Sequence, residues 1–140
     1  MGKLTIRGRP FIPGSAEGVA VVSNEPLSFW GGYAWERGEI IDRRHPLSGQ
    51  IAKGKILAIP FTRGSSTTTA VLLESIRAGT APSAIITTAT DFFFALASVV
   101  ADELYTKPLP LIAVAGPDFA KLQTGDYLKI DNSGIITIVR

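Results

Sequence analysis

Three short apolar runs separated by two helical stretches constrain the fold of this chain more than any other feature. The runs cover residues 56–60, 83–87 and 111–114. Between them, residues 67–77 carry apolar side chains at helical spacing, and Asp91 stands where an N-cap would start a helix through Leu104. Strands that alternate with helices in this order require right-handed crossovers and a mainly parallel sheet. The pattern therefore predicts an α/β fold.

Further β segments flank this unit and exceed what one parallel sheet can hold. Strands are expected at residues 4–7, 18–23 and 39–42, with a terminal hairpin formed by residues 127–131 and 135–139 around a turn at 132–134. Residues 26–38, which include the Gly31-Gly32 pair, are interpreted as an irregular loop, and residues 117–122 as a short helix. We expect one β/β/α three-layer domain over residues 1–140.

The composition excludes several classes of function. Of the 140 residues, 46% are hydrophobic and 19% are charged, which favours a packed domain over disorder. The net charge of +2 comes without a basic block, so no nucleic-acid partner is expected. The most apolar run, residues 92–101, is about half the length that a membrane span requires, so no membrane is expected either. The chain lacks cysteine and a signal-like N-terminus, which favours a cytoplasmic protein without disulfides.

The loop after the first buried strand is the strongest candidate for chemistry. In open parallel sheets, ligands gather beyond the carboxyl ends of the strands. The loop there contains Arg63-Gly64-Ser65-Ser66 and then three threonines. If a helix begins near Ser65 or Ser66, its free N–H groups favour an anion and stabilise a serine oxyanion. Arg63 adds a bidentate donor for a carboxylate.

A purely structural interpretation of this loop stays open. A Ser/Thr run before an apolar helix is often only an N-cap, because these side chains satisfy the first N–H groups of the helix. The segment has neither the glycine–lysine pattern of a nucleotide P-loop nor the glycine spacing of a dinucleotide fold. Kinase and NAD-dependent chemistry are therefore excluded.

Two other sets of residues invite a functional interpretation. His45 is the only histidine, and a serine triad with Asp42 is conceivable, but its polar surroundings favour an exposed side chain without a catalytic role. The three phenylalanines at positions 92 to 94 are expected in the core, with any exposed part available as a partner surface. The acidic residues show no spacing typical of a metal site, so no metal is expected on this chain.

Several linked segments resemble the small-subunit domain of the aconitase X family. They cover residues 27–32, 38–42, 45–50, 63–66 and 78–86, and the similarity runs in order from about Gly8 to Ile130. The resemblance implies a swivelling domain, like the small domain of aconitase, that docks on a large subunit as a heterodimer. The large subunit would carry an iron or iron–sulfur centre, and this chain alone would bind no cofactor.

The resemblance also implies an activity. Members of the family are hydro-lyases that dehydrate small hydroxy acids, either cis-3-hydroxy-L-proline or, in archaea, mevalonate 5-phosphate. Carried over by motif, Ser65 would accept the proton α to a carboxylate. Arg63, Gly64 and Ser66 would shape the pocket for the substrate anion. The chain would be active only with its large subunit.

One departure from the wider aconitase superfamily bears on the substrate. Thr67 and Thr68 replace the Arg-Glu pair that follows Gly-Ser-Ser there, which argues against citrate or isopropylmalate. Arg63 is the only cation within the loop, so cis-3-hydroxy-L-proline is favoured over a phosphorylated substrate. Mevalonate 5-phosphate remains the alternative substrate. A non-catalytic carboxylate-binding or structural subunit is the alternative of another class.

Overall fold

The structure, a computed structural model, describes residues 3–63 and 66–140. Eight strands form one sheet and two form a small hairpin. The strands are β1 (Lys3–Arg7), β2 (Arg9–Ile12), β3 (Ala16–Val22), β4 (Tyr33–Ala34), β5 (Glu39–Ile40), β6 (Ile56–Ala58), β7 (Ala84–Thr87), β8 (Leu111–Ala113), β9 (Tyr127–Ile130) and β10 (Ile135–Val139). The helices are α1 (Ser66–Ala78), α2 (Phe92–Tyr105) and α3 (Gly116–Phe119). No helix in the described part of the chain is long and apolar enough to span a membrane.

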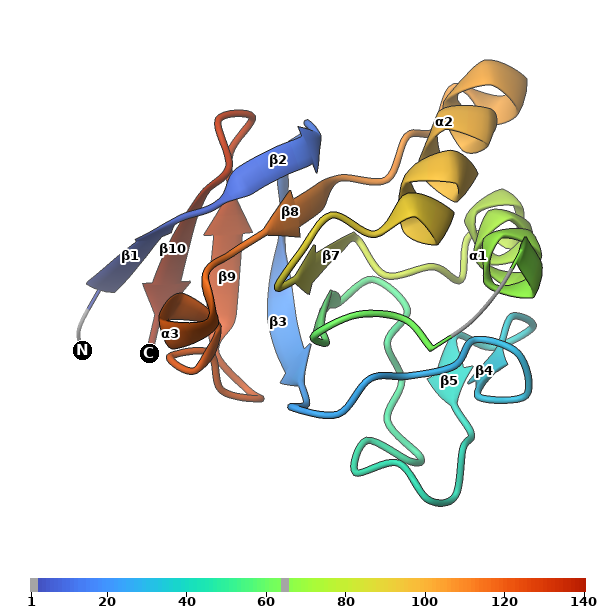
Figure 1. Cartoon of the computed structure of the whole chain (residues 1–140), viewed down its shortest axis with the longest axis horizontal. Helices are drawn as coiled ribbons and strands as arrows, with labels where there is room; N and C mark the ends of the chain where they lie inside the picture. The colour runs from blue at the N-terminus through green and yellow to red at the C-terminus, as the bar shows by residue number, and fades with distance from the viewer. Residues whose placement is uncertain (1–2, 64–65) are drawn as a thin grey trace.

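The large sheet has the strand order β1-β10-β9-β3-β6-β7-β8-β2. Strands β3, β6, β7 and β8 are parallel to one another, and the remaining pairings are antiparallel. The parallel part covers the three apolar runs, as the sequence predicted. Strands β1 and β2 follow each other directly, yet they occupy opposite ends of the strand order. The sheet therefore curls on itself, with Gly8 at the corner (Figure 1).

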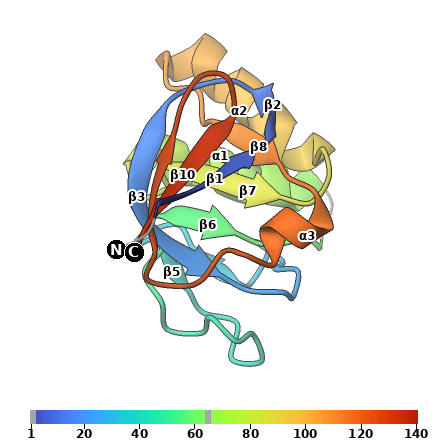
Figure 2. The ribbon, with the colours of Figure 1, turned by 90° about the vertical axis from the view of Figure 1, so that its left-hand side faces the viewer.

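The molecule has three layers, which confirms the predicted β/β/α arrangement. Strands β1, β10 and β9 form one layer, the parallel strands form the middle, and α1 and α2 cover the far side (Figure 1). Figure 2 shows the first layer in front of the helices. Two buried clusters fill the two spaces between the layers. Because the middle layer is covered on both faces, its strands are apolar at consecutive positions.

Strand β6 and Ile59, the residue after it, show this double burial most clearly. Leu57 and Ile59 point to the helical side, whereas Ile56 and Ala58 point to the antiparallel strands. Helix α1 ends at Ala78, and Gly79 follows with a φ of 78°, so the predicted stop is confirmed. The terminal hairpin is also confirmed, with Gly134 at a φ of 85° in its turn.

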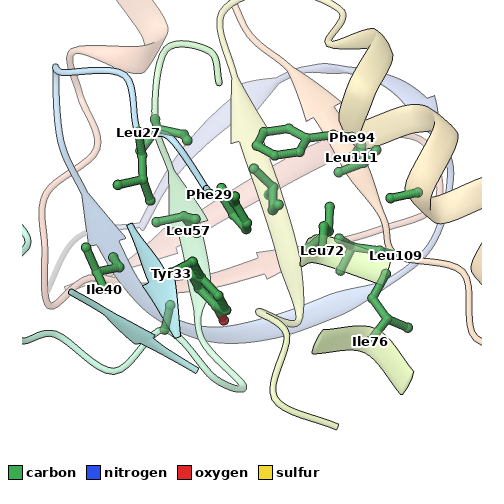
Figure 3. Packing of buried hydrophobic residues seen from close by; sticks show 14 of the residues in the cluster. Leu27, Phe29, Tyr33, Ile40, Leu57, Leu72, Ile76, Phe94, Leu109 and Leu111 are labelled. Atoms are coloured by element: carbon green, nitrogen blue, oxygen red, sulfur yellow. The ribbon is translucent and has the colours of Figure 1, made fainter. Parts of the chain in front are cut away.

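The segment interpreted as an irregular loop, residues 26–38, contributes more to the fold than expected. Its Tyr33–Ala34 strand pairs with β5, and Phe29 and Tyr33 are buried with their rings stacked at a centroid distance of 4.8 Å (Figure 3). The Tyr33 hydroxyl donates to the Thr80 carbonyl oxygen at 2.7 Å, and burial raises its pKa. The segment is a core element because its aromatic rings fill the space beside α1.

The prediction that three consecutive phenylalanines lie in the core is only partly correct. Phe94 is fully buried, but Phe92 is 68% exposed. Successive residues of an α-helix are about 100° apart around its axis, so three neighbours cannot all face one side. Phe92 therefore belongs to the outer face of α2.

Candidate functional site

The loop between β6 and α1 carries the residues that the sequence singled out. Arg63 and Ser66 lie within the described residues, and both are exposed. Gly64 and Ser65 lie outside the described residues. Ser66 is the first residue of α1, a helix of 13 residues. The loop thus leads directly into a helix N-terminus at the carboxyl edge of the parallel strands, where backbone N–H groups and the helix dipole favour an anion.

Backbone hydrogen bonds hold the first half of this loop. The Thr62 N–H donates to Asp91 Oδ2 at 3.0 Å, and the Arg63 N–H donates to the Leu27 carbonyl oxygen at 3.0 Å. The Thr62 hydroxyl donates to the same Leu27 oxygen at 3.2 Å. Residues 62 and 63 are therefore fixed by two other segments, one before β4 and one at the start of α2.

Asp91 is the N-cap of α2, as the sequence predicted. Its Oδ1 accepts the N–H groups of Phe93 and Phe94, each at 3.1 Å. Its other oxygen holds Thr62, so one buried carboxylate joins the β6–α1 loop to the start of α2. The Thr69 hydroxyl donates to the Phe93 carbonyl oxygen at 2.9 Å and links α1 directly to α2.

Thr67 and Thr68, which replace the superfamily's Arg-Glu pair, differ in how deeply they are buried. Thr68 is fully buried, and its hydroxyl lies 3.4 Å from the Thr62 hydroxyl. Thr67 is half-buried. Position 68 faces the core, so a long charged side chain there would require the surrounding residues to repack.

Two cavities open at the carboxyl edge of the sheet. One, of about 350 Å³, is lined by Glu25, Pro26, Asp42, Arg44, His45 and Arg63. The other, also about 350 Å³, is lined by residues that include Arg7, Arg9 and Thr88. A cavity of about 320 Å³ lies at the opposite end, where Gly54 and Pro82 precede their strands. Of the three, the first contains Arg63 and stands beside the candidate loop.

His45 lies in this first cavity but is not exposed, contrary to the prediction. It is only 6% exposed, and both ring nitrogens have partners. Nε2 donates to the Glu25 carbonyl oxygen at 3.1 Å, and Nδ1 accepts the Leu47 N–H at 3.1 Å, which requires the neutral Nε2–H tautomer. His45 therefore holds two loops together and has no nitrogen left to serve as a base, so a Ser–His–Asp triad is not formed.

The residues of this chain do not fit an iron or iron–sulfur centre. The chain has no cysteine, and among residues 3–63 and 66–140 no three His, Asp or Glu side chains gather as metal ligands. The ring nitrogens of His45 are both engaged in hydrogen bonds. An iron centre expected from the resemblance would need its ligands from another part of the enzyme.

Sequence reasoning did not assign Arg44, Arg7 or Arg9 to this edge, and it named Asp42 only as a conceivable triad partner of His45. Asp42 and Arg44 come from the loop after β5 and line the same cavity as Arg63. The sequence had placed Arg63 as the only cation of the β6–α1 loop. The only sequence signal for Asp42 and Arg44 was their position within residues 38–50, which carry the family resemblance. Arg7 and Arg9, which flank Gly8, were not singled out either.

Comparisons with known proteins agree with this fold. The family model of the aconitase X swivel domain matches residues 5–138. A solved structure of aconitase X from Thermococcus kodakaraensis, in its holo-form, superposes with a TM-score of 0.86 at 32% identity, covering 98% of this chain and 99% of that one. The chain belongs to the aconitase X family and is a swivel domain of that family.

Two curated relatives differ in how this domain is used. A cis-3-hydroxy-L-proline dehydratase of Pseudomonas aeruginosa is 46% identical over 87% of this chain, which corresponds to 21% of that protein. A phosphomevalonate dehydratase small subunit of Thermococcus gammatolerans is 36% identical over 91% of this chain and 92% of its own length. The chain thus spans about a fifth of the hydroxyproline dehydratase and nearly all of the small subunit.

Proposed function

We propose that this chain is the serine-bearing part of a hydro-lyase that dehydrates cis-3-hydroxy-L-proline. The observation that carries the proposal is the position of Arg63 and Ser66: both are exposed at the carboxyl edge of the sheet, and Ser66 is the first residue of α1. The 46% identity to a protein named for this activity supports the substrate. A cytoplasmic location stays a prediction from composition.

Each proposed role follows from the chemistry of the reaction. Ser65 accepts the proton from the carbon α to the carboxylate, and the electron pair of that C–H bond forms a double bond to C3. The C3–O bond breaks, and the hydroxide leaves as water once it is protonated. Serine is a weak base at its free pKa, so it depends on the N–H donors that a helix N-terminus supplies. Arg63, with Gly64 and Ser66, would hold the carboxylate.

We do not assign the activation of the leaving hydroxyl group to this chain. A leaving hydroxide needs a Lewis acid or a general acid. We assign that task, together with the iron or iron–sulfur centre, to a large subunit or its equivalent in a longer chain. This large-subunit part is the proposed partner, and the swivel domain alone is expected to be inactive. The exposed apolar side chains of α2, described below, support such a partner.

A second substrate is favoured by a separate observation. The cavity beside Gly8 is lined by Arg7 and Arg9, and no acidic residue is among its lining residues in the described chain. Two guanidinium groups without a carboxylate suit a phosphate. Mevalonate 5-phosphate therefore remains the alternative, in line with the relatives named phosphomevalonate dehydratase small subunit.

The test is dehydration of both substrates by this chain, by the large-subunit part and by the two together. Turnover is expected only in the mixture, and Ser65→Ala is expected to abolish it without loss of assembly. Ser83→Ala, at the opposite end of the sheet, is the matched control and should keep full activity. Unchanged turnover in Ser65→Ala would refute the serine mechanism, and turnover of mevalonate 5-phosphate alone would refute the substrate.

A further inference from the structure

The cavity beside Arg63 has an unusual balance of charge. Its lining residues include two arginines, Arg44 and Arg63, and two acidic residues, Asp42 and Glu25. These four side chains come from three loops that follow β3, β5 and β6. Their formal charges cancel, so the cavity as a whole favours neither a simple anion nor a simple cation.

These charges are not paired with each other. The ion pairs found among residues 3–63 and 66–140 are Arg37–Glu39, Arg77–Glu74, Lys121–Asp118 and Arg140–Asp126, and none of them involves the cavity. Opposite charges that line one space without touching leave room for a ligand that carries both signs. Such a ligand can pair with each side at hydrogen-bond distance, where a charge-assisted bond is strong.

The walls of the cavity are held by hydrogen bonds to the backbone. His45 ties the loop after β5 to the Glu25 carbonyl oxygen at 3.1 Å. Asp42 Oδ1 accepts the Arg44 N–H at 3.0 Å, which fixes the carboxylate on its own loop. The Arg63 backbone is fixed by the Leu27 carbonyl oxygen at 3.0 Å. The residues that line the cavity therefore stand on anchored segments, which lowers the entropic cost of binding a ligand.

We propose that this cavity binds the zwitterionic head of an α-amino acid, an inference that rests on the proposed function. Arg63 and Arg44 take the carboxylate, and Asp42, with Glu25 beside it, takes the protonated ring nitrogen of cis-3-hydroxy-L-proline. Both groups are attached to the α-carbon, so holding them fixes the carbon from which the proton is removed. Arg63 precedes Ser66, the first residue of α1, by three positions, so this carbon is held near the start of α1.

The same cavity disfavours the alternative substrate. Mevalonate 5-phosphate has a carboxylate and a phosphate but no cationic group. Asp42 and Glu25 would then face only negative charge, which weakens binding. The two carboxylates thus act as specificity-determining residues for an amino acid.

Two competitive inhibitors that differ at one atom test the proposal on the complete enzyme. L-proline carries the ammonium group, and (S)-tetrahydrofuran-2-carboxylate has an uncharged oxygen in its place. Wild-type enzyme is expected to bind L-proline at least about 10-fold more tightly, the factor that one hydrogen bond to a charged group supplies. Binding is measured by calorimetry, which needs no turnover.

Asp42→Asn is the decisive variant, because the amide oxygen can still accept the Arg44 N–H and the loop should keep its shape. It is expected to erase the preference for L-proline and to raise KM for cis-3-hydroxy-L-proline about 10-fold, with a smaller change in kcat. Glu25→Gln should act in the same direction. Glu39→Gln removes a carboxylate outside the cavity and should change neither value.

The outcomes separate this inference from the proposed function. Equal binding of the two inhibitors to wild-type enzyme, or an unchanged preference in Asp42→Asn, overturns the assignment of the cavity even if the enzyme dehydrates cis-3-hydroxy-L-proline. A complete enzyme that binds L-proline through Asp42 but does not turn over cis-3-hydroxy-L-proline supports the cavity and refutes the proposed substrate.

Discussion

Asp91 is the residue on which the position of the candidate loop most depends. It is 8% exposed and accepts three backbone N–H groups, two from the first turn of α2 and one from Thr62. A buried N–H that loses its acceptor costs more than an exposed one, because water does not replace the partner. The carboxylate therefore supports the fold and, through Thr62, the segment that enters α1.

Asp91→Ala is expected to lower the free energy of unfolding by about 2 kcal/mol, as for a lost N-cap with a further buried N–H. It should also lower kcat of the complete enzyme, because the Thr62 N–H loses its acceptor and only the bonds to Leu27 still hold this part of the loop. Asp131→Ala is the control: Asp131 accepts the N–H groups of Ser133 and Ile135 in the terminal hairpin, far from the loop in the fold. Denaturant unfolding and steady-state kinetics would show whether kcat falls only in the first variant. A folded Asp91→Ala enzyme with normal kcat would contradict this role.

The sequence predicted one of the two roles of Asp91, the N-cap of α2, but not its bond to Thr62. The cap at Asp91 follows from local signals, namely an acceptor directly before an apolar helical run. Its bond to Thr62 spans 29 positions and depends on how two loops meet, which no local pattern encodes. His45 was misjudged for the same reason. Its neighbours in sequence are polar, but its neighbours in space are the Glu25 carbonyl and the Leu47 N–H.

At the scale of elements, helix α2 shows two apolar faces. Phe94, Ala97, Ser98 and Ala101 face the core. On the outer side, Phe92, Leu96 and Val99 follow at intervals of four and three residues and are 68%, 40% and 50% exposed. This spacing places them on one stripe of the helix. A contiguous exposed stripe of this kind is typical of an interaction surface.

The double variant Phe92→Ser, Leu96→Ser is expected to weaken binding of the large-subunit part by at least about 10-fold, since each buried apolar side chain contributes on the order of 1–2 kcal/mol. Fold stability should change little, because both side chains are exposed. Val19→Ser, on β3, removes an apolar side chain that is 40% exposed on another element and serves as the control. The dissociation constant of the complex is the measurement. If only Val19→Ser weakened binding, the interface would lie on β3 and not on α2.

The elements themselves were predictable to different degrees. The β6–α1–β7–α2–β8 unit was predicted because a strand that is buried on both faces has apolar residues at consecutive positions, and such a run is easy to recognise in the sequence. Strand β2 was missed because it lies at one end of the strand order and contains Arg9 and Pro10, so it has no apolar pattern. Strand β5 lies within the strand predicted at residues 39–42, but its partner β4 was missed because it has only two residues, and aromatic packing from Phe29 and Tyr33 holds it in place.

At the scale of the whole molecule, Gly8 is where the chain crosses from one sheet layer to the other. Its N–H donates to the Gly134 carbonyl oxygen at 2.9 Å. A Cβ at this position would lie 2.3 Å from Ile112 Cγ2 and 3.1 Å from the Gly134 oxygen. The corner that closes the curled sheet therefore has no room for a side chain.

Gly8→Ala is expected to lower the free energy of unfolding by about 1–3 kcal/mol, the usual cost of overpacking a buried site. Gly116→Ala is the matched control, because a Cβ there meets no atom within 4 Å. Urea unfolding of the two variants gives the comparison directly. Equal stabilities would mean that Ile112 moves aside without cost and that the corner is not tightly packed.

The pairing of β1 with β10 has a consequence for how this domain can be joined to other polypeptides. Lys3 lies opposite Val139 in that pair, so the two ends of the described chain leave the fold as neighbours (Figures 1 and 2). A polypeptide tethered to either end, or to both, is attached at a single point. The domain can then pivot about that point as a rigid body. The same architecture therefore suits a separate subunit and a module within a longer chain, the two forms in which its relatives carry it.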